Sequence, residues 1–228
     1  AKSEVEFQVA AFQQSLPAGV QLGIVTPTGA QIAQVVTGTP VQGVFITDAF
    51  KGMSSDLVSR VRSAVNLGLR EGETAAQIAR RLSGVSGGQG GVFGQTRRHL
   101  HTWARTSVNH VTNAAREVTY MQNTDLMKGV RYVATLDART TDICKSLDGK
   151  VFPINEGERP PMHHQCRSTT TPVMRSAEEL FGGKVKDLPP GTRASMNGQV
   201  PETTTYADWL RGQPRRIQNL ALGKGRAQ

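Results

Sequence analysis

Hydrophobic positions recur at helical spacing along three stretches of the chain. From Ser54 they fall at steps of three and four residues, which predicts an amphipathic helix, at Leu57, Val58, Val61, Ala64, Val65 and Leu69. A second helix follows, because Thr74 to Gln77 fits a capping box and Gly84 is placed to end it. The strongest pattern runs from Thr96 to about Asn123, where apolar side chains keep one helix face for about seven turns.

Glycine and proline interrupt the pattern in two regions. Residues 1 to about 50 are rich in Gln, Gly, Thr and Val, with little charge to support an exposed helix. They predict an extended or weakly β arm, with a partly disordered terminus as the alternative. Residues 84–94 contain six glycines and predict a flexible linker and a domain boundary.

After Gly129 the hydrophobic period switches to two. The alternating residues Val130, Tyr132, Ala134 and Leu136 predict a strand. Asp148-Gly149 before Val151 is a hairpin turn signal, and residues 168–173 are expected to supply a return strand. Ser176 to Glu179 fits a capping box for a short helix, and beyond Lys186 the chain turns irregular, apart from amphipathic pieces near Tyr206 and Ile217.

Composition narrows the class of protein. The 228 residues carry 27 Lys plus Arg against 18 Asp plus Glu, a net charge of +9, with only 5% aromatics. No apolar run approaches the roughly 18 to 20 residues that a membrane span needs, so a membrane-spanning protein is excluded. Two cysteines do not make a disulfide framework, which indicates a reducing compartment. We expect a modest core with small-residue packing.

Three metal-competent side chains lie close together in the sequence. His163 and Cys166 are spaced to chelate from one turn, and Cys144 is expected from the neighbouring hairpin. Zinc takes about four N, S or O ligands, and His164, Asp137 or Asp142 is available as the fourth. Three alternatives remain open: a Cys144–Cys166 disulfide, two buried unpaired thiols, and a cysteine nucleophile with a histidine base.

These patterns together predict an α+β, helix-rich fold. It has an N-terminal extended arm and helices, a long central helix, a small β-hairpin motif stapled by metal, and an irregular C-terminal tail. The predicted domains are an extended arm (1–50), a helical hairpin (51–84), a Gly-rich linker (85–95), a domain with the long helix and the Cys/His motif (96–186), and a basic C-terminal tail (187–228).

The amino-acid sequence of the Cys/His region resembles that of a known family. The run TTDICKSLDGKVF followed by PPMHHQCR, with YADWLRGQP near the end of the chain, strongly resembles the phage Mu F-like head-morphogenesis family of minor head proteins over about residues 45–228. Family members often read C-R-C where Ser168 here follows Cys166-Arg167. The resemblance implies the ligands Cys144, His163 and Cys166 and the structural motif residues Asp137, Arg139, Thr140, Asp148, Gly149, Pro160, Pro161 and Arg167.

The resemblance further implies a minor head protein of a tailed phage. Such a protein is not an enzyme and takes no small-molecule substrate. It binds the portal protein, with the major capsid protein and packaged DNA as further partners, and acts in head morphogenesis and DNA packaging or delivery. Its expected location is the virion, in the head interior or at the portal vertex, and the host cytoplasm during assembly. Zinc is the expected cofactor.

The basic excess extends to the end of the chain. After Asp208 no acid occurs, and the cations expected to contact nucleic acid or the portal are Arg211, Arg215, Arg216, Lys224 and Arg226. A tail that only increases solubility is the alternative. Two rival functions remain: a metal-dependent nuclease or toxin-like enzyme, and a stand-alone zinc module that binds nucleic acid.

Overall fold

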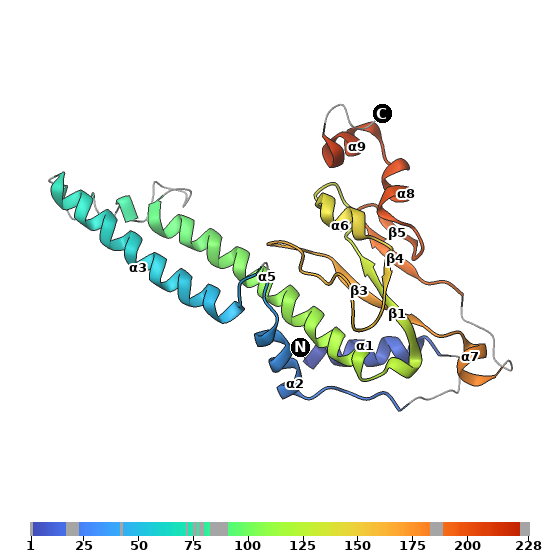
Figure 1. Cartoon of the computed structure of the whole chain (residues 1–228). Coiled ribbons are helices and arrows are strands. Elements are labelled where there is room, and N and C mark those ends of the chain that lie inside the picture. Colours follow the sequence, from blue (N-terminus) through green and yellow to red (C-terminus); the bar gives the residue numbers. More distant parts are fainter. Residues whose placement is uncertain are drawn as a thin grey trace. The chain divides into compact units, whose positions relative to one another are not determined.

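The computed structural model of the chain describes residues 2–16, 23–41, 43–71, 73–74, 77, 80–82, 91–182 and 189–223 (Figure 1). They form two compact units, one from residues 1–36 and 109–228 and the other from residues 37–108. The mixed α+β, helix-rich class predicted from the sequence is confirmed. The division into five sequence segments stays a prediction.

The first unit is built on a three-stranded antiparallel sheet. Its strands are β1 (Met127–Val133), β2 (Val151–Phe152) and β3 (Thr169–Met174), in the order β2-β1-β3. Val130 on the central strand pairs with Phe152 on one side and Pro172 on the other. The predicted alternation is confirmed, because Val130, Tyr132, Ala134 and Leu136 are all buried.

The predicted hairpin at Asp148-Gly149 is wrong. These residues follow a short helix, α6 (Asp142–Leu147), and lead from it into β2. Gly149 has a φ of +80°, a conformation that glycine adopts without strain. An Asp-Gly pair therefore marks a left-handed turn here, but the turn connects a helix to a strand and not two strands.

The extended arm predicted for residues 1–50 is also wrong. This region contains the helices α1 (Lys2–Gln14) and α2 (Gly29–Gly38). Val5, Gln8 and Phe12 are buried at helical spacing, so the helical period is present but includes a polar residue. The helix is weakly amphipathic because its buried face mixes polar and apolar side chains, so the spacing of apolar residues alone does not predict it.

Helix α1 packs against the C-terminal part of α5 (Gly91–Met121), the longest helix of the chain. The rings of Phe12 and Tyr120 meet edge to face, 6.2 Å apart, and the Tyr120 hydroxyl donates to Gln8. Arg116 forms an ion pair with Glu4 in which both side chains are largely buried. α5 leads through a 3₁₀ turn (η1, Thr124–Leu126) into β1, so the long helix sets the position of the central strand.

The predicted irregular C-terminal tail is wrong as well, because much of it is regular structure. It contains a hairpin of β4 (Thr192–Ser195) and β5 (Gly198–Pro201), then α8 (Tyr206–Arg211) and α9 (Arg215–Leu222). These elements are ordered because they bury apolar side chains in one cluster, which consists of Leu136, Tyr206, Trp209, Leu210 and Ala221. Ahead of them, α7 (Ala177–Phe181) begins with the predicted capping box of Ser176 and Glu179.

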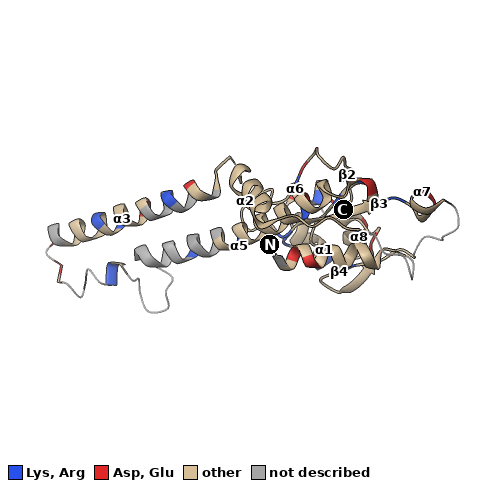
Figure 2. Cartoon of the chain, turned by 90° about the horizontal axis from the view of Figure 1, so that it is seen from below, with Lys and Arg blue, Asp and Glu red and all other residues tan. Residues whose placement is uncertain are grey.

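The second unit contains α3 (Ile46–Arg70) and the first part of α5. Lys and Arg recur along α3 (Figure 2), and two of them pair with acids of the same helix, Lys51 with Asp48 and Arg60 with Asp56. The predicted capping box of Thr74 and Gln77 is confirmed by reciprocal hydrogen bonds. Gly84 and the predicted linker up to residue 90 lie outside the described residues, and α5 begins at Gly91.

Across the described part of the chain, no helix combines the length and the apolar character required to cross a membrane.

Candidate metal centre

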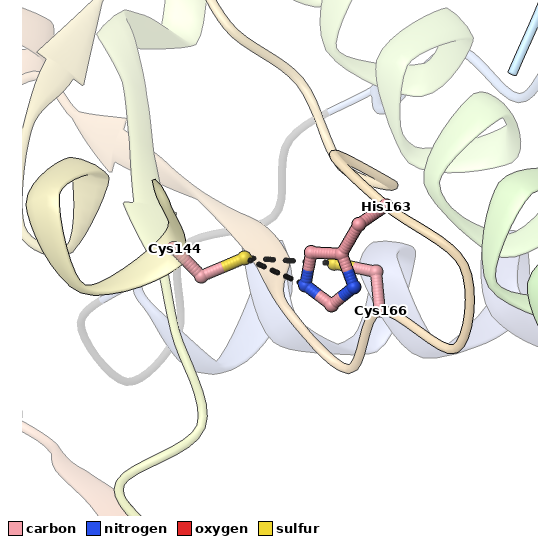
Figure 3. A group of neighbouring side chains, drawn as sticks. All are labelled: Cys144, His163 and Cys166. Atoms are coloured by element: carbon pink, nitrogen blue, oxygen red, sulfur yellow. Dashed lines mark hydrogen bonds between the residues drawn. The ribbon is translucent and has the colours of Figure 1, made fainter. Parts of the chain in front are cut away.

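Cys144, His163 and Cys166 converge on one point in the first unit (Figure 3). The Cys144 Sγ lies 3.3 Å from His163 Nε2 and 3.8 Å from Cys166 Sγ. Both cysteines are buried and free, and His163 is half-buried. We call these three residues the Cys/His group. A search of the described residues for three or more potential metal ligands close together finds this group.

Helix α6 presents Cys144 to this point. Cys144 and Leu147 lie three residues apart and are both buried, so they occupy the inner face of the helix. They pack with Tyr132, Ala134 and Cys166 in one apolar cluster beside the sheet. The cysteine therefore comes from a helix, and not from the hairpin that the sequence predicted.

A tight turn presents the other two ligands. The Cys166 N–H donates to the His163 carbonyl, 3.2 Å away, which confirms the predicted single turn. The His163 Nδ1 lies 2.8 Å from the backbone oxygen of His164. Because a carbonyl only accepts, Nδ1 carries the proton and leaves the lone pair of Nε2 directed toward Cys144. A histidine with one ring nitrogen hydrogen-bonded to a carbonyl and the other facing a cysteine sulfur is arranged like a metal ligand.

The two thiols share a proton unequally. The hydrogen bond from the Cys166 thiol lowers the pKa of Cys144 to about 4, against the raising effect of burial. The same contact and burial raise the pKa of Cys166. Burial also raises the pKa of Tyr132, so its hydroxyl stays protonated and donates to the Cys144 sulfur at 3.3 Å. The lowered pKa of Cys144 favours its thiolate, which is the form that binds a cation.

The two separations measured from Cys144 Sγ are close to those of a zinc site. Two thiolates bound to one tetrahedral zinc, each at about 2.3 Å, have sulfurs about 3.8 Å apart. A thiolate and an imidazole nitrogen on the same ion are about 3.5 Å apart. The observed separations of 3.8 Å and 3.3 Å are close to both values. Two sulfurs and one nitrogen also form a soft donor set, which favours zinc over magnesium or calcium.

The three residues considered for a fourth ligand have other contacts. The Asp137 carboxylate accepts two hydrogen bonds from Arg167, and the Asp142 carboxylate accepts one from Lys145 at 2.8 Å. His164 is exposed and supplies its backbone oxygen to His163. The identity of the fourth ligand stays a prediction.

Asp137 organises the turn that precedes α6. Its carboxylate accepts from the Arg139 N–H at 2.9 Å and from the Thr140 hydroxyl at 3.3 Å. Burial acts to raise the pKa of Asp137, but the hydrogen bonds from Arg167 and Arg139 prevail and lower it. The cation in close contact with the Asp137 carboxylate is Arg167, the residue after Cys166. The exposed Arg139 guanidinium lies farther away, 4.0 Å from the same carboxylate.

Asp148 occupies the other end of α6. Its side chain is fully buried and accepts from the Ala134 N–H at 2.7 Å and from the Tyr206 N–H at 2.6 Å. Arg193 donates to both carboxylate oxygens, at 2.9 Å and 3.1 Å. Pro160 and Pro161, further members of the predicted motif, are joined by a cis peptide bond just before His163.

Two residues of the site were missed by sequence reasoning. The period-two pattern predicts that Tyr132 faces inward from the strand, but it does not predict the partner of its hydroxyl. Arg193 has no local signal, because it pairs with a residue 45 positions earlier. The tail cations Lys224 and Arg226 lie outside the described residues, whereas Arg211, Arg215 and Arg216 are exposed on α8 and α9.

Comparison with known families relates the region around the Cys/His group to a phage protein family. The family model described as Phage Mu protein F like protein matches residues 59–171, which include the Cys/His group. Over this range the chain is similar to the Phage Mu protein F like family, which supports the resemblance found in the sequence. No curated protein and no solved structure matches the chain significantly.

Proposed function

We propose that this chain is a minor head protein of a tailed phage. In this role it binds the portal and the head interior and acts in head morphogenesis and in DNA packaging or delivery. The observation that carries the proposal is the family match over residues 59–171. The basic surplus of +9 supports it, since both the packaged genome and an acidic protein surface attract such a chain.

Co-purification with the portal tests this role. We expect the chain, co-expressed with the portal protein of the same phage, to elute with it as a stable complex from a size-exclusion column. The same chain expressed with an unrelated portal is the control. If the cognate pair elutes as two separate species under assembly conditions, the proposed role as a portal-associated head protein is overturned.

We further propose that zinc holds the Cys/His group together in the folded protein. Cys144, His163 and Cys166 would be its ligands, and when bound the ion would supply a structural crosslink between α6 and the turn at residues 163–166. The match between the observed donor separations and tetrahedral zinc supports this proposal. A small sheet with a modest apolar core gains stability from such a crosslink.

The proposal assigns the chain no catalytic activity. A nuclease would need carboxylates that hold a divalent ion with an open position. Three aspartates near the group are each engaged by a cation: Asp137 by Arg167, Asp142 by Lys145, and Asp148 by Arg193. This pairing supports a structural site over the nuclease alternative.

The exposed cations of α8 and α9 are proposed to contact DNA phosphates without reading sequence. The change Arg215→Gln with Arg216→Gln is expected to reduce the slope of log affinity against log salt by about 2, because each lost phosphate contact removes about 0.9. Filter binding to a random duplex at several salt concentrations measures this slope. Arg139→Gln, which removes an exposed cation elsewhere, is the control, and an unchanged slope in the double variant contradicts the proposed contact.

A further inference from the structure

The C-terminal segment, defined as residues 192–222, is linked directly or through Asp137 to both parts of the chain that carry the Cys/His group. It comprises β4, β5, α8 and α9 and lies outside the range matched by the family model. One set of contacts reaches α6, which carries Cys144. The other reaches Asp137, whose carboxylate binds Arg167, the residue that follows Cys166. The segment therefore borders the candidate metal centre through α6 and through Asp137, without supplying a ligand to it.

The first contact holds the end of α6. The Asp148 N–H donates to the Cys144 carbonyl at 3.1 Å, so the residue closes the helical turn that contains the ligand. Its fully buried carboxylate then binds the Arg193 guanidinium and the Tyr206 N–H, both from the C-terminal segment. A shift of Arg193 or Tyr206 would thus move the end of α6 and Cys144 with it.

The second contact holds α6 from its outer side. Lys145 follows Cys144 directly, and its Nζ donates to the Ala221 carbonyl at 2.6 Å. The same ammonium group lies 5.6 Å from the centre of the Tyr206 ring, within the range of a cation–π contact. Lys145 is largely buried by these contacts, with 13% of its side chain exposed, so α6 is fixed to both α8 and α9.

The third contact is linked, through Asp137, to the turn that carries Cys166. The Tyr206 hydroxyl donates to the Asp137 carbonyl at 2.9 Å. The Asp137 carboxylate binds the guanidinium of Arg167, the residue that follows Cys166. Tyr206 therefore reaches both cysteine segments, through Asp148 by its backbone and through Asp137 by its hydroxyl.

We propose that docking of the C-terminal segment positions the cysteine ligands, so that metal binding and docking strengthen each other. This inference rests on the proposed zinc centre. Arg193 is the positioning residue, because its two hydrogen bonds to Asp148 join the segment to the helix of Cys144. Linkage requires the coupling to be reciprocal. Zinc therefore also holds α8 and α9 in place, together with the exposed cations Arg215 and Arg216 that they carry.

Zinc affinity of an Arg193 variant tests the coupling in one direction. The full chain carrying Arg193→Gln is titrated with zinc against a chromophoric chelator, at a temperature where circular dichroism shows it folded. We expect its zinc affinity to fall roughly 10- to 100-fold, as for other residues that orient metal ligands. Arg193→Lys keeps the charge but loses the paired hydrogen bonds. Its zinc affinity should lie between that of Arg193→Gln and that of the wild type. Arg211→Gln, an exposed cation of the same segment, should bind zinc like the wild type.

Spectroscopy and hydrogen exchange test the reciprocal direction. Cobalt substituted for zinc should show altered thiolate and d–d bands in Arg193→Gln, which a loss of stability alone would not produce. Backbone amides of α8 should exchange faster after zinc is removed from the wild type. Wild-type affinity and an unchanged cobalt spectrum in Arg193→Gln would overturn the coupling and leave the zinc centre intact. A wild-type chain that binds no zinc would overturn the zinc centre itself.

Discussion

Replacing Cys144 with serine is expected to abolish stoichiometric zinc binding and to lower the Tm by about 8–16 °C. Zinc at about 1,000 times its Kd stabilises the folded state by about 4 kcal/mol, and 1 kcal/mol corresponds to about 2–4 °C for a chain of this length. Serine keeps the size of the side chain but lacks the thiolate that the hydrogen bonds from Cys166 and Tyr132 stabilise. Calorimetry in reducing buffer and elemental analysis of the purified protein measure the two effects.

A chelator separates loss of the metal from loss of packing. Chelation should lower the Tm of the wild type to that of Cys144→Ser and leave the variant unchanged. Ser146→Ala, an exposed change on the same helix, should retain both zinc and stability. If the wild type holds no zinc and its thiols react with an alkylating reagent only after reduction, Cys144 and Cys166 form a disulfide and the zinc proposal is wrong.

Local signals explain why part of this structure could be predicted from the sequence. The capping box of Ser176 and Glu179 and the period-two alternation around Val130 depend on neighbours within a few residues, and both were confirmed. The His163 to Cys166 spacing likewise predicts a chelating turn, because three residues span one turn. Each of these patterns is complete within a short stretch of chain.

Other parts could not be predicted because their determinants are distant or ambiguous. The Asp148-Gly149 pair specifies a left-handed turn, but whether a helix or a strand precedes that turn depends on the packing of Cys144 and Leu147. The C-terminal elements are ordered by contacts such as Arg193 with Asp148, whose partners are 45 residues apart. Helix α1 was missed because its buried face includes Gln8, which is satisfied by Tyr120 more than a hundred residues later.

The second large effect is expected on the free energy of unfolding, when the buried Asp148–Arg193 ion pair is broken. Asp148→Asn is expected to lower the free energy of unfolding by about 3–5 kcal/mol, because breaking a buried ion pair leaves the remaining charge uncompensated. The new amide group would also direct donors at Arg193, which has only donors to offer. Urea denaturation of the zinc-loaded protein, extrapolated linearly to water, measures the change.

An exposed aspartate–arginine pair within the C-terminal segment provides the matched control. Asp208 and Arg211 are 55% and 75% exposed, whereas Asp148 is fully buried and Arg193 is 10% exposed. Solvent screens the exposed pair, so Asp208→Asn should cost at most about 1 kcal/mol. Because both variants remove the same charge from the same kind of pair, the difference between them measures the effect of burial. Equal losses in the two variants would show that Asp148 does not hold the C-terminal segment against α6.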